Sequence, residues 1–188
     1  MDGDRSGSEE NFATAASSLY DELLWVHSMI RRDLDRVAEL AAEAVDGLHP
    51  AEVREQVASL KANGFLWRLK LTCLQYCRFV DSHHRLEDAA LFPALRRSDS
   101  ALDPVIDRLE VEHRDVGVLL DEVEAIADAL EESDRNGVRT RLVESLHSLG
   151  DVLLAHLAFE EESLQPALSK MTVADVLGPG RPSDARED

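Results

Sequence analysis

The chain has few cysteines, few basic residues and no long apolar run, and each shortage argues against a class of protein. Cys73 and Cys77 lack the second cysteine pair that a structural zinc site needs, so we interpret them as core thiols in a reducing compartment. Only 20 lysines and arginines stand against 38 aspartates and glutamates, and this net charge of -18 argues against nucleic acid and anionic membrane surfaces as partners. The longest apolar stretches, such as VLLAHLAF, are too short to cross a bilayer.

The chain also lacks any sign of a secretory signal or of strands. Its start, MDGDRSGSEEN, has neither a basic region nor an apolar one, so we expect a cytoplasmic protein. No segment alternates apolar and polar residues with period two, which argues against a sheet. Apolar residues instead recur at helical spacing over residues 14–45, 51–91, 104–132 and 138–165.

The predicted fold is all-α, an up-down-up-down four-helix bundle with a short extra helix before the second long helix. Asn63 and Gly64 divide that second region, and its long helix ends near Pro93. Trp25 and Trp67 are interpreted as packing residues. The predicted organisation is a disordered N-terminal tail over 1–13, the bundle over 14–170, and a largely disordered C-terminal extension over 171–188.

One short pattern occurs twice in the chain. Residues 83–95 read HHRLEDAALFPAL, and residues 156–168 read HLAFEEESLQPAL. In each copy a histidine (His83, His156) is followed four residues later by a glutamate (Glu87, Glu160) and then by a second acid. Residues i and i+4 of a helix differ by about 40° in direction and about 6 Å in height, so the two side chains point the same way. Two such pairs in matching frames predict two halves of a metal site.

A weaker sequence similarity relates the other two predicted long helices. His27 and His113 are followed at the same intervals by two apolar residues, an aspartate and a further apolar residue, which indicates a doubled helix hairpin. A lone histidine in an apolar stripe is best interpreted as a core residue, but four of them with two inward carboxylates need cations, because unpaired buried carboxylates are costly. The predicted metal ligands are His27, His83, Glu87, His113, His156 and Glu160.

The donor types narrow the metal. Imidazole and carboxylate groups suit iron, manganese or zinc, and the absence of thiolates disfavours a tetrahedral structural zinc. Two carboxylates can bridge two metals, and six protein ligands shared over two metals leave positions where a small molecule can bind. The repeat frame selects Glu160 as the carboxylate on the fourth helix, while Glu161 stays a candidate.

The whole pattern, His…HHxxED-x4-FP…EH…HxxxEE-x4-P, resembles the hemerythrin-like (HHE cation-binding) family over most of residues 15–168. The resemblance implies a four-helix bundle around a non-haem di-iron centre, with two iron ions that can share an oxo or hydroxo bridge. The six residues named above correspond to the family's ligands, and the two glutamates to its bridging carboxylates. The implied function is to bind or react with a small oxidant: O2, peroxide or NO.

One position departs from the oxygen-carrying members of that family, which have a second histidine four residues after the one on the third helix. Here that position is Gly117. Tyr20, Tyr76 or Glu110 are candidate substitutes, although Tyr76 is best interpreted as a core tyrosine. His84 points about 100° away from its neighbour, and either a hydrogen bond behind a ligand or a helix contact would explain it. The departure argues against simple reversible O2 carriage.

Other functions compete with this one. An iron- or oxygen-sensing role, or iron storage without turnover, would keep the metals. A ferritin-like carboxylate oxidase would need two Glu-x-x-His motifs, and the chain supplies one, Glu110 to His113. A metal-free helical interaction module would leave all four histidines as core residues.

Overall fold

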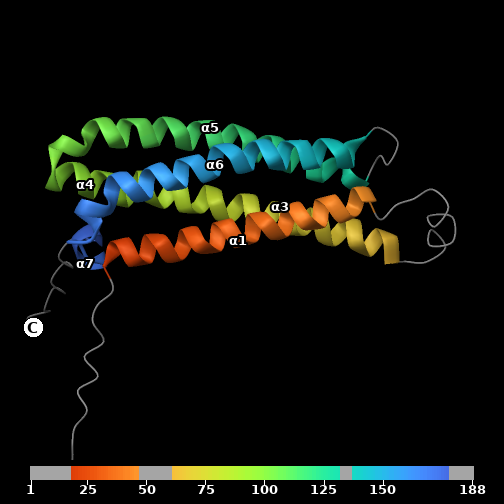
Figure 1. Cartoon of the computed structure of the whole chain (residues 1–188), viewed down its shortest axis with the longest axis horizontal. Helices are drawn as coiled ribbons and strands as arrows, with labels where there is room; N and C mark the ends of the chain where they lie inside the picture. Colours follow the sequence, from red (N-terminus) through yellow and green to blue (C-terminus); the bar gives the residue numbers. More distant parts are fainter. Residues whose placement is uncertain (1–17, 47–60, 132–136, 178–188) are drawn as a thin grey trace, which may run out of the picture.

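Four long helices make up the computed structural model, which describes residues 18–46, 61–131 and 137–177. They are α1 (Leu19–Asp46), α3 (Lys61–Leu86), α5 (Asp103–Asp128) and α6 (Val138–Leu168). Helices α1 and α5 each pack against both α3 and α6, so the four close a ring, and Figure 1 shows them side by side in alternating directions. This confirms the predicted all-α four-helix bundle.

Short helices complete the described chain. A π-helix, η1 (Glu87–Leu91), follows α3 directly and leads into α4 (Phe92–Ser98). Two 3-10 turns, η2 (Ser100–Leu102) and η3 (Ala129–Glu131), flank α5, and α7 (Val173–Leu177) follows α6. The predicted extra helix before the second long helix and the predicted disorder of residues 1–13 lie outside the described residues. Of the C-terminal extension predicted over 171–188, the structure describes residues 171–177, which include α7, and the rest lies outside.

Two predicted helix boundaries are wrong. Helix α3 begins at Lys61 and passes through Asn63 and Gly64, so these residues do not divide it; a glycine near a helix start costs only about 1 kcal/mol. The helical path also continues beyond Pro93 to Ser98. Proline is tolerated there because it lies in the first turn of α4, just after the wide π turn, where its missing N–H is not needed.

The buried side chains form two apolar clusters. The larger one, which we call the main cluster, contains residues from all four long helices, such as Ile30, Val80, Val116 and Leu153. The smaller one, the end cluster, lies at the end of the bundle that carries α4, to the left in Figure 1. Its buried members are Leu23, Phe92, Leu95, Ile106, Leu109, Leu164 and Leu168.

Between the two clusters the core is polar. Along α1, His27 lies between Leu23 of the end cluster and Ile30 of the main cluster, and along α5 His113 lies between Leu109 and Val116 in the same way. We call the whole set the polar layer: His27, His83, His84, Glu87, His113, His156 and Glu160. All of these side chains are at most 8% exposed.

The two tryptophans differ from expectation. Trp25 and Trp67 are 61% and 48% exposed, so the interpretation of both as packing residues is wrong.

Among the described helices, α6 is long and apolar enough to cross a membrane by length and composition alone, with 44% of the relevant window buried in the bundle. This is weak evidence, because the core helix of a soluble protein meets the same criterion.

Candidate metal centre

The bundle brings all six predicted residues together and adds a seventh, His84. The first group, which we call the mixed group, consists of His27, His83, Glu87 and Glu160. The second, the histidine group, consists of His84, His113 and His156. Within each group the potential ligand atoms all lie within 4.8 Å of one another, which is close enough to hold a metal ion. Each long helix contributes at least one residue, and η1 contributes Glu87.

The two glutamates connect the groups. Oε1 of Glu87 lies 3.2 Å from Nε2 of His83, and its Oε2 lies 3.5 Å from Nε2 of His113. Oε2 of Glu160 lies 3.4 Å from Nε2 of His27 and 3.8 Å from Nε2 of His156. Ligand atoms that share a metal at bonds of about 2.1 Å are about 3.0–3.4 Å apart. Each carboxylate therefore faces one histidine of each group, as a carboxylate that bridges two cations must.

Three of the histidines form a hydrogen bond to a carboxylate through Nδ1, on the side of the ring that faces away from the polar layer. In each pair Nδ1 of the ring can donate its proton to a carboxylate oxygen, which leaves the Nε2 lone pair facing the polar layer. The pairs are His27 with Glu161 (2.8 Å), His113 with Asp88 (2.8 Å) and His156 with Glu112 (3.0 Å). Metal-binding histidines in proteins commonly have such a partner on the second nitrogen.

The structure separates the two carboxylate candidates on α6. Glu160 is fully buried in the mixed group, whereas Glu161 accepts hydrogen bonds from His27 and, at 2.7 Å, from Arg31. Burial tends to raise the pKa of Glu161, but these two hydrogen bonds outweigh it, and the pKa lies below its ordinary value. Glu161 is therefore an ionised partner of His27, and Glu160 is the acid whose oxygens lie within the polar layer.

The protonation states suit a metal. Burial, with smaller contributions from neighbouring imidazoles, lowers the pKa of His83 and of His113 to about 3. Both rings are therefore neutral at pH 7 and have a free lone pair. Burial raises the pKa of Glu87 well above its ordinary value, and the negative charge of Glu160 adds to this effect. A cation between the two acids would favour their ionised forms.

Several buried atoms of the polar layer have no hydrogen-bond partner among the described residues. They are both oxygens of Glu87 and of Glu160, and Nε2 of His84, His113 and His156. A buried polar atom without a partner costs about 1–3 kcal/mol, and more if it is charged. All of these atoms belong to the two groups and suit metal coordination, so cations would remove the deficit.

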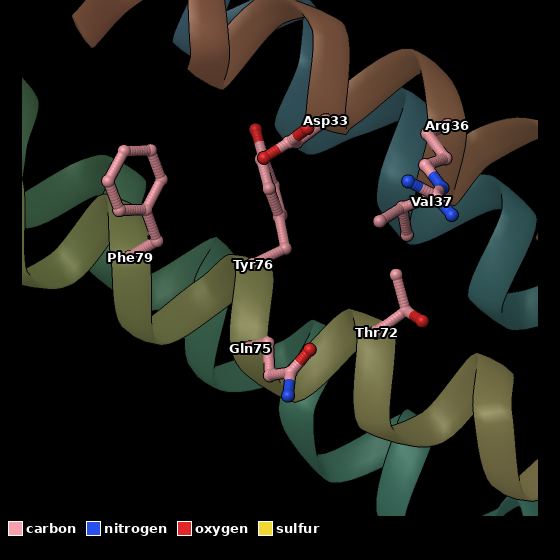
Figure 2. A pocket seen from close by; sticks show the side chains of 7 residues that line it. All are labelled: Asp33, Arg36, Val37, Thr72, Gln75, Tyr76 and Phe79. Atoms are coloured by element: carbon pink, nitrogen blue, oxygen red, sulfur yellow. The ribbon is translucent and has the colours of Figure 1, made fainter.

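The proposed substitutes for a ligand at Gly117 lie elsewhere. Tyr20 packs against the end cluster, and Glu110 lies 3.3 Å from the guanidinium of Arg96. Tyr76 belongs to the main cluster, as expected for a core tyrosine, about two helical turns from His83. Figure 2 shows its ring pointing from α3 toward α1, where it lines a pocket of about 380 Å³ together with Asp33, Arg36, Val37, Thr72, Gln75 and Phe79.

His84 is absent from the ligand set predicted from the sequence. It points about 100° away from the preceding His83, and this divergence alone argues against a shared site. However, His84 is also three residues before Glu87, and residues at i and i+3 lie on the same side of a helix. That spacing was the available signal.

Comparison with protein families agrees with this geometry. The model of the hemerythrin HHE cation-binding domain matches residues 18–168, which contain every residue of the polar layer. Comparisons with curated proteins and with solved structures gave no match. Since the family model covers most of the chain, this protein belongs to the hemerythrin HHE cation-binding domain family.

Proposed function

We propose that this protein is a non-haem di-iron protein that binds or reacts with a small oxidant, namely O2, peroxide or NO. The observation that carries the proposal is the pair of ligand groups joined by Glu87 and Glu160 inside the bundle. Neither carboxylate has a hydrogen-bond partner among the described residues, and buried carboxylates without a cationic partner are costly, so two divalent cations suit the site.

The residues of the chain have distinct parts in this proposal. The mixed group would hold one iron and the histidine group the other, with Glu87 and Glu160 shared between them. When bound, the iron pair would supply reversible redox chemistry and open coordination positions for a small molecule. Glu161, Asp88 and Glu112 would keep their histidine partners oriented, since each accepts a hydrogen bond on the outer nitrogen.

The surroundings favour small, uncharged or weakly charged reactants. The end cluster and the main cluster enclose the polar layer on both sides, and Phe92 stacks on His113 with ring centroids 5.3 Å apart. Such packing would limit the access of water and of organic substrates to the centre, which favours diatomic molecules or peroxide as the reactants. The two thiols do not compete for the metal, because Cys73 and Cys77 lie in the main cluster.

The first test is the metal content of the purified protein with its optical spectrum. Near-stoichiometric loading with two irons per chain, and near-ultraviolet bands of an oxidised iron pair, would support the proposal. Changing both glutamates, Glu87→Gln with Glu160→Gln, should abolish loading. His147→Ala, a histidine exposed on α6, should leave it intact. Binding of less than two irons per chain by the wild-type protein, after supply of ferrous iron, would contradict the proposal.

The second test concerns the reactant. The iron-loaded protein should consume peroxide faster than the metal-free protein, and its spectrum should change on addition of O2 or NO. Equal peroxide consumption by both forms, together with an unchanged spectrum, would overturn the oxidant function while leaving the metal site in place. Iron storage or sensing without turnover would then be the better explanation.

A further inference from the structure

The internal repeat makes the polar-layer positions of the two halves of the centre equivalent except at one residue. Under the repeat, the first-helix histidines correspond, as do the His-x-x-x-Glu pairs, and the outer acids Asp88 and Glu161 also correspond. Asp88 lies 2.8 Å from His113, and Glu161 lies 2.8 Å from His27, so each acid accepts a hydrogen bond from the histidine of the other half and these hydrogen bonds also repeat. His84 breaks this equivalence, because its counterpart is Leu157, a fully buried member of the main cluster.

The side chain of His84 is built into the centre. It is 4% exposed, and its ring stacks on His113 with centroids 4.1 Å apart and an interplanar angle of 11°. It lies nearly perpendicular to His156, at 5.1 Å and 82°. Its Nε2 is buried and has no hydrogen-bond partner in the part of the chain that the structure describes. This unpartnered nitrogen is the atom of His84 that would complete the histidine group.

Gly117 has open space beside it. A Cβ added at this glycine would meet no heavy atom of the described residues within 4 Å. Crowding therefore does not explain why this residue is a glycine. Helix α5 contains one histidine, His113, and that histidine belongs to the centre. The coordination that a second α5 histidine would provide has to come from another helix.

We propose that His84 is a ligand of the iron held by His113 and His156, and that it takes the place of the ligand missing at Gly117; this rests on the di-iron function proposed above. A packing role does not explain the residue, because Leu157 shows that the equivalent position accepts an apolar side chain. In a packing role, the buried Nε2 without a hydrogen-bond partner among the described residues would also be destabilising, whereas a metal would satisfy it.

One consequence is that the two metals are unequal. The histidine group supplies three imidazoles and the mixed group supplies two, while both share the same glutamates. The asymmetry comes from α3, which contributes adjacent histidines to different groups, His83 to one and His84 to the other. The metal held by the mixed group therefore has fewer protein ligands and more positions for a small molecule.

The test is to exchange His84 for the residue at the equivalent position, His84→Leu, and to measure iron per chain together with the Mössbauer spectrum. We expect loading to fall from two irons to about one, with loss of the signal of one iron. The double variant His84→Leu with Gly117→His should regain the second iron, because the space at Gly117 is free. The control is His147→Leu, which changes an exposed histidine in the same way and should retain both irons.

The outcomes separate this inference from the function on which it rests. Wild-type protein that binds less than two irons would refute the di-iron function itself. Wild-type protein with two irons, and His84→Leu protein that keeps both with an unchanged Mössbauer spectrum, would overturn the role of His84 alone. Circular dichroism checks that each variant is folded. If His84→Leu does not fold, His84→Asn, which retains a polar side chain, is judged by the same two criteria.

Discussion

Replacing Glu87 with glutamine should stabilise the metal-free protein at neutral pH while weakening its hold on metal. Both oxygens of Glu87 are buried without a hydrogen-bond partner among the residues that the structure describes, and the charge of Glu160 lies beside them. Glutamine keeps the shape of the side chain but removes its desolvation penalty as an ion and its repulsion with Glu160. A buried amide without partners costs about 1–3 kcal/mol and an unpaired ion several, so we expect a gain of about 1–3 kcal/mol.

The size of this gain depends on pH, and its sign follows from the raised pKa of Glu87. Below the ordinary value of 4.5, Glu87 is protonated in the folded and the unfolded chain alike. Above it the unfolded chain loses the proton first, so the folded state loses stability by up to about 1.4 kcal/mol per pH unit. The loss is complete once the pH exceeds the folded-state pKa. The advantage of Glu87→Gln should therefore be small near pH 4.5 and should grow toward neutral pH.

Urea unfolding of the chelator-treated proteins, followed by circular dichroism at pH 5 to 8, measures the effect. Glu162→Gln is the matched control, because it removes an exposed acid from a chain of net charge -18. Metal at 100 times its dissociation constant should stabilise the wild-type protein by about 2.7 kcal/mol, and the Glu87→Gln protein by much less. Destabilisation by Glu87→Gln at pH 7, or equal stabilisation of both proteins by metal, would refute the reasoning.

Further predictions concern the residues around the centre. Glu161→Gln should weaken metal binding about 10- to 100-fold in a chelator competition without changing the number of metals at saturation, because the partner of His27 is altered; an unchanged affinity would contradict this. Gly117→Ala should raise the free energy of unfolding in urea by about 0.5–1 kcal/mol, since the added methyl group meets open space, and a decrease would show that the glycine is required. Burial raises the pKa of Cys73 and Cys77 to about 12, so a thiol reagent at pH 8 should label neither cysteine in the folded protein within the time in which it labels both in urea. Rapid labelling of the folded protein would show that the thiols are accessible.

The bundle and the convergence of the candidate ligands could be predicted because both depend on helical periodicity. Spacing of four residues places His83 with Glu87 and His156 with Glu160 on common helix faces, whatever the neighbouring helices do. The structure brings these residues together as expected, although their binding of metal remains a prediction. The repeat also selects Glu160 over Glu161, and the burial of the two side chains agrees with that choice.

Other features depend on contacts between helices, which periodicity does not describe. The acid Glu112 faces His156 from α5, and nothing in either local sequence indicates that pair. The π-helix η1 widens the turn between Glu87 and Leu91 and lets the helical path pass Pro93, whereas a proline in a regular helix usually marks its end. The exposure of Trp25 likewise depends on which faces its neighbours cover.

The position of the polar layer between two separate apolar clusters has a consequence for cooperativity. The buried side chains of the end cluster, from α4 and the adjoining ends of α1, α5 and α6, are separated from those of the main cluster by that layer. Without cations, the unpartnered polar atoms of the layer destabilise the contact between the two clusters. We therefore expect this end of the bundle to unfold as a unit, with a lower free energy of opening than the remainder. Metal held by ligands from every long helix would tie the two regions together and turn two unfolding units into one.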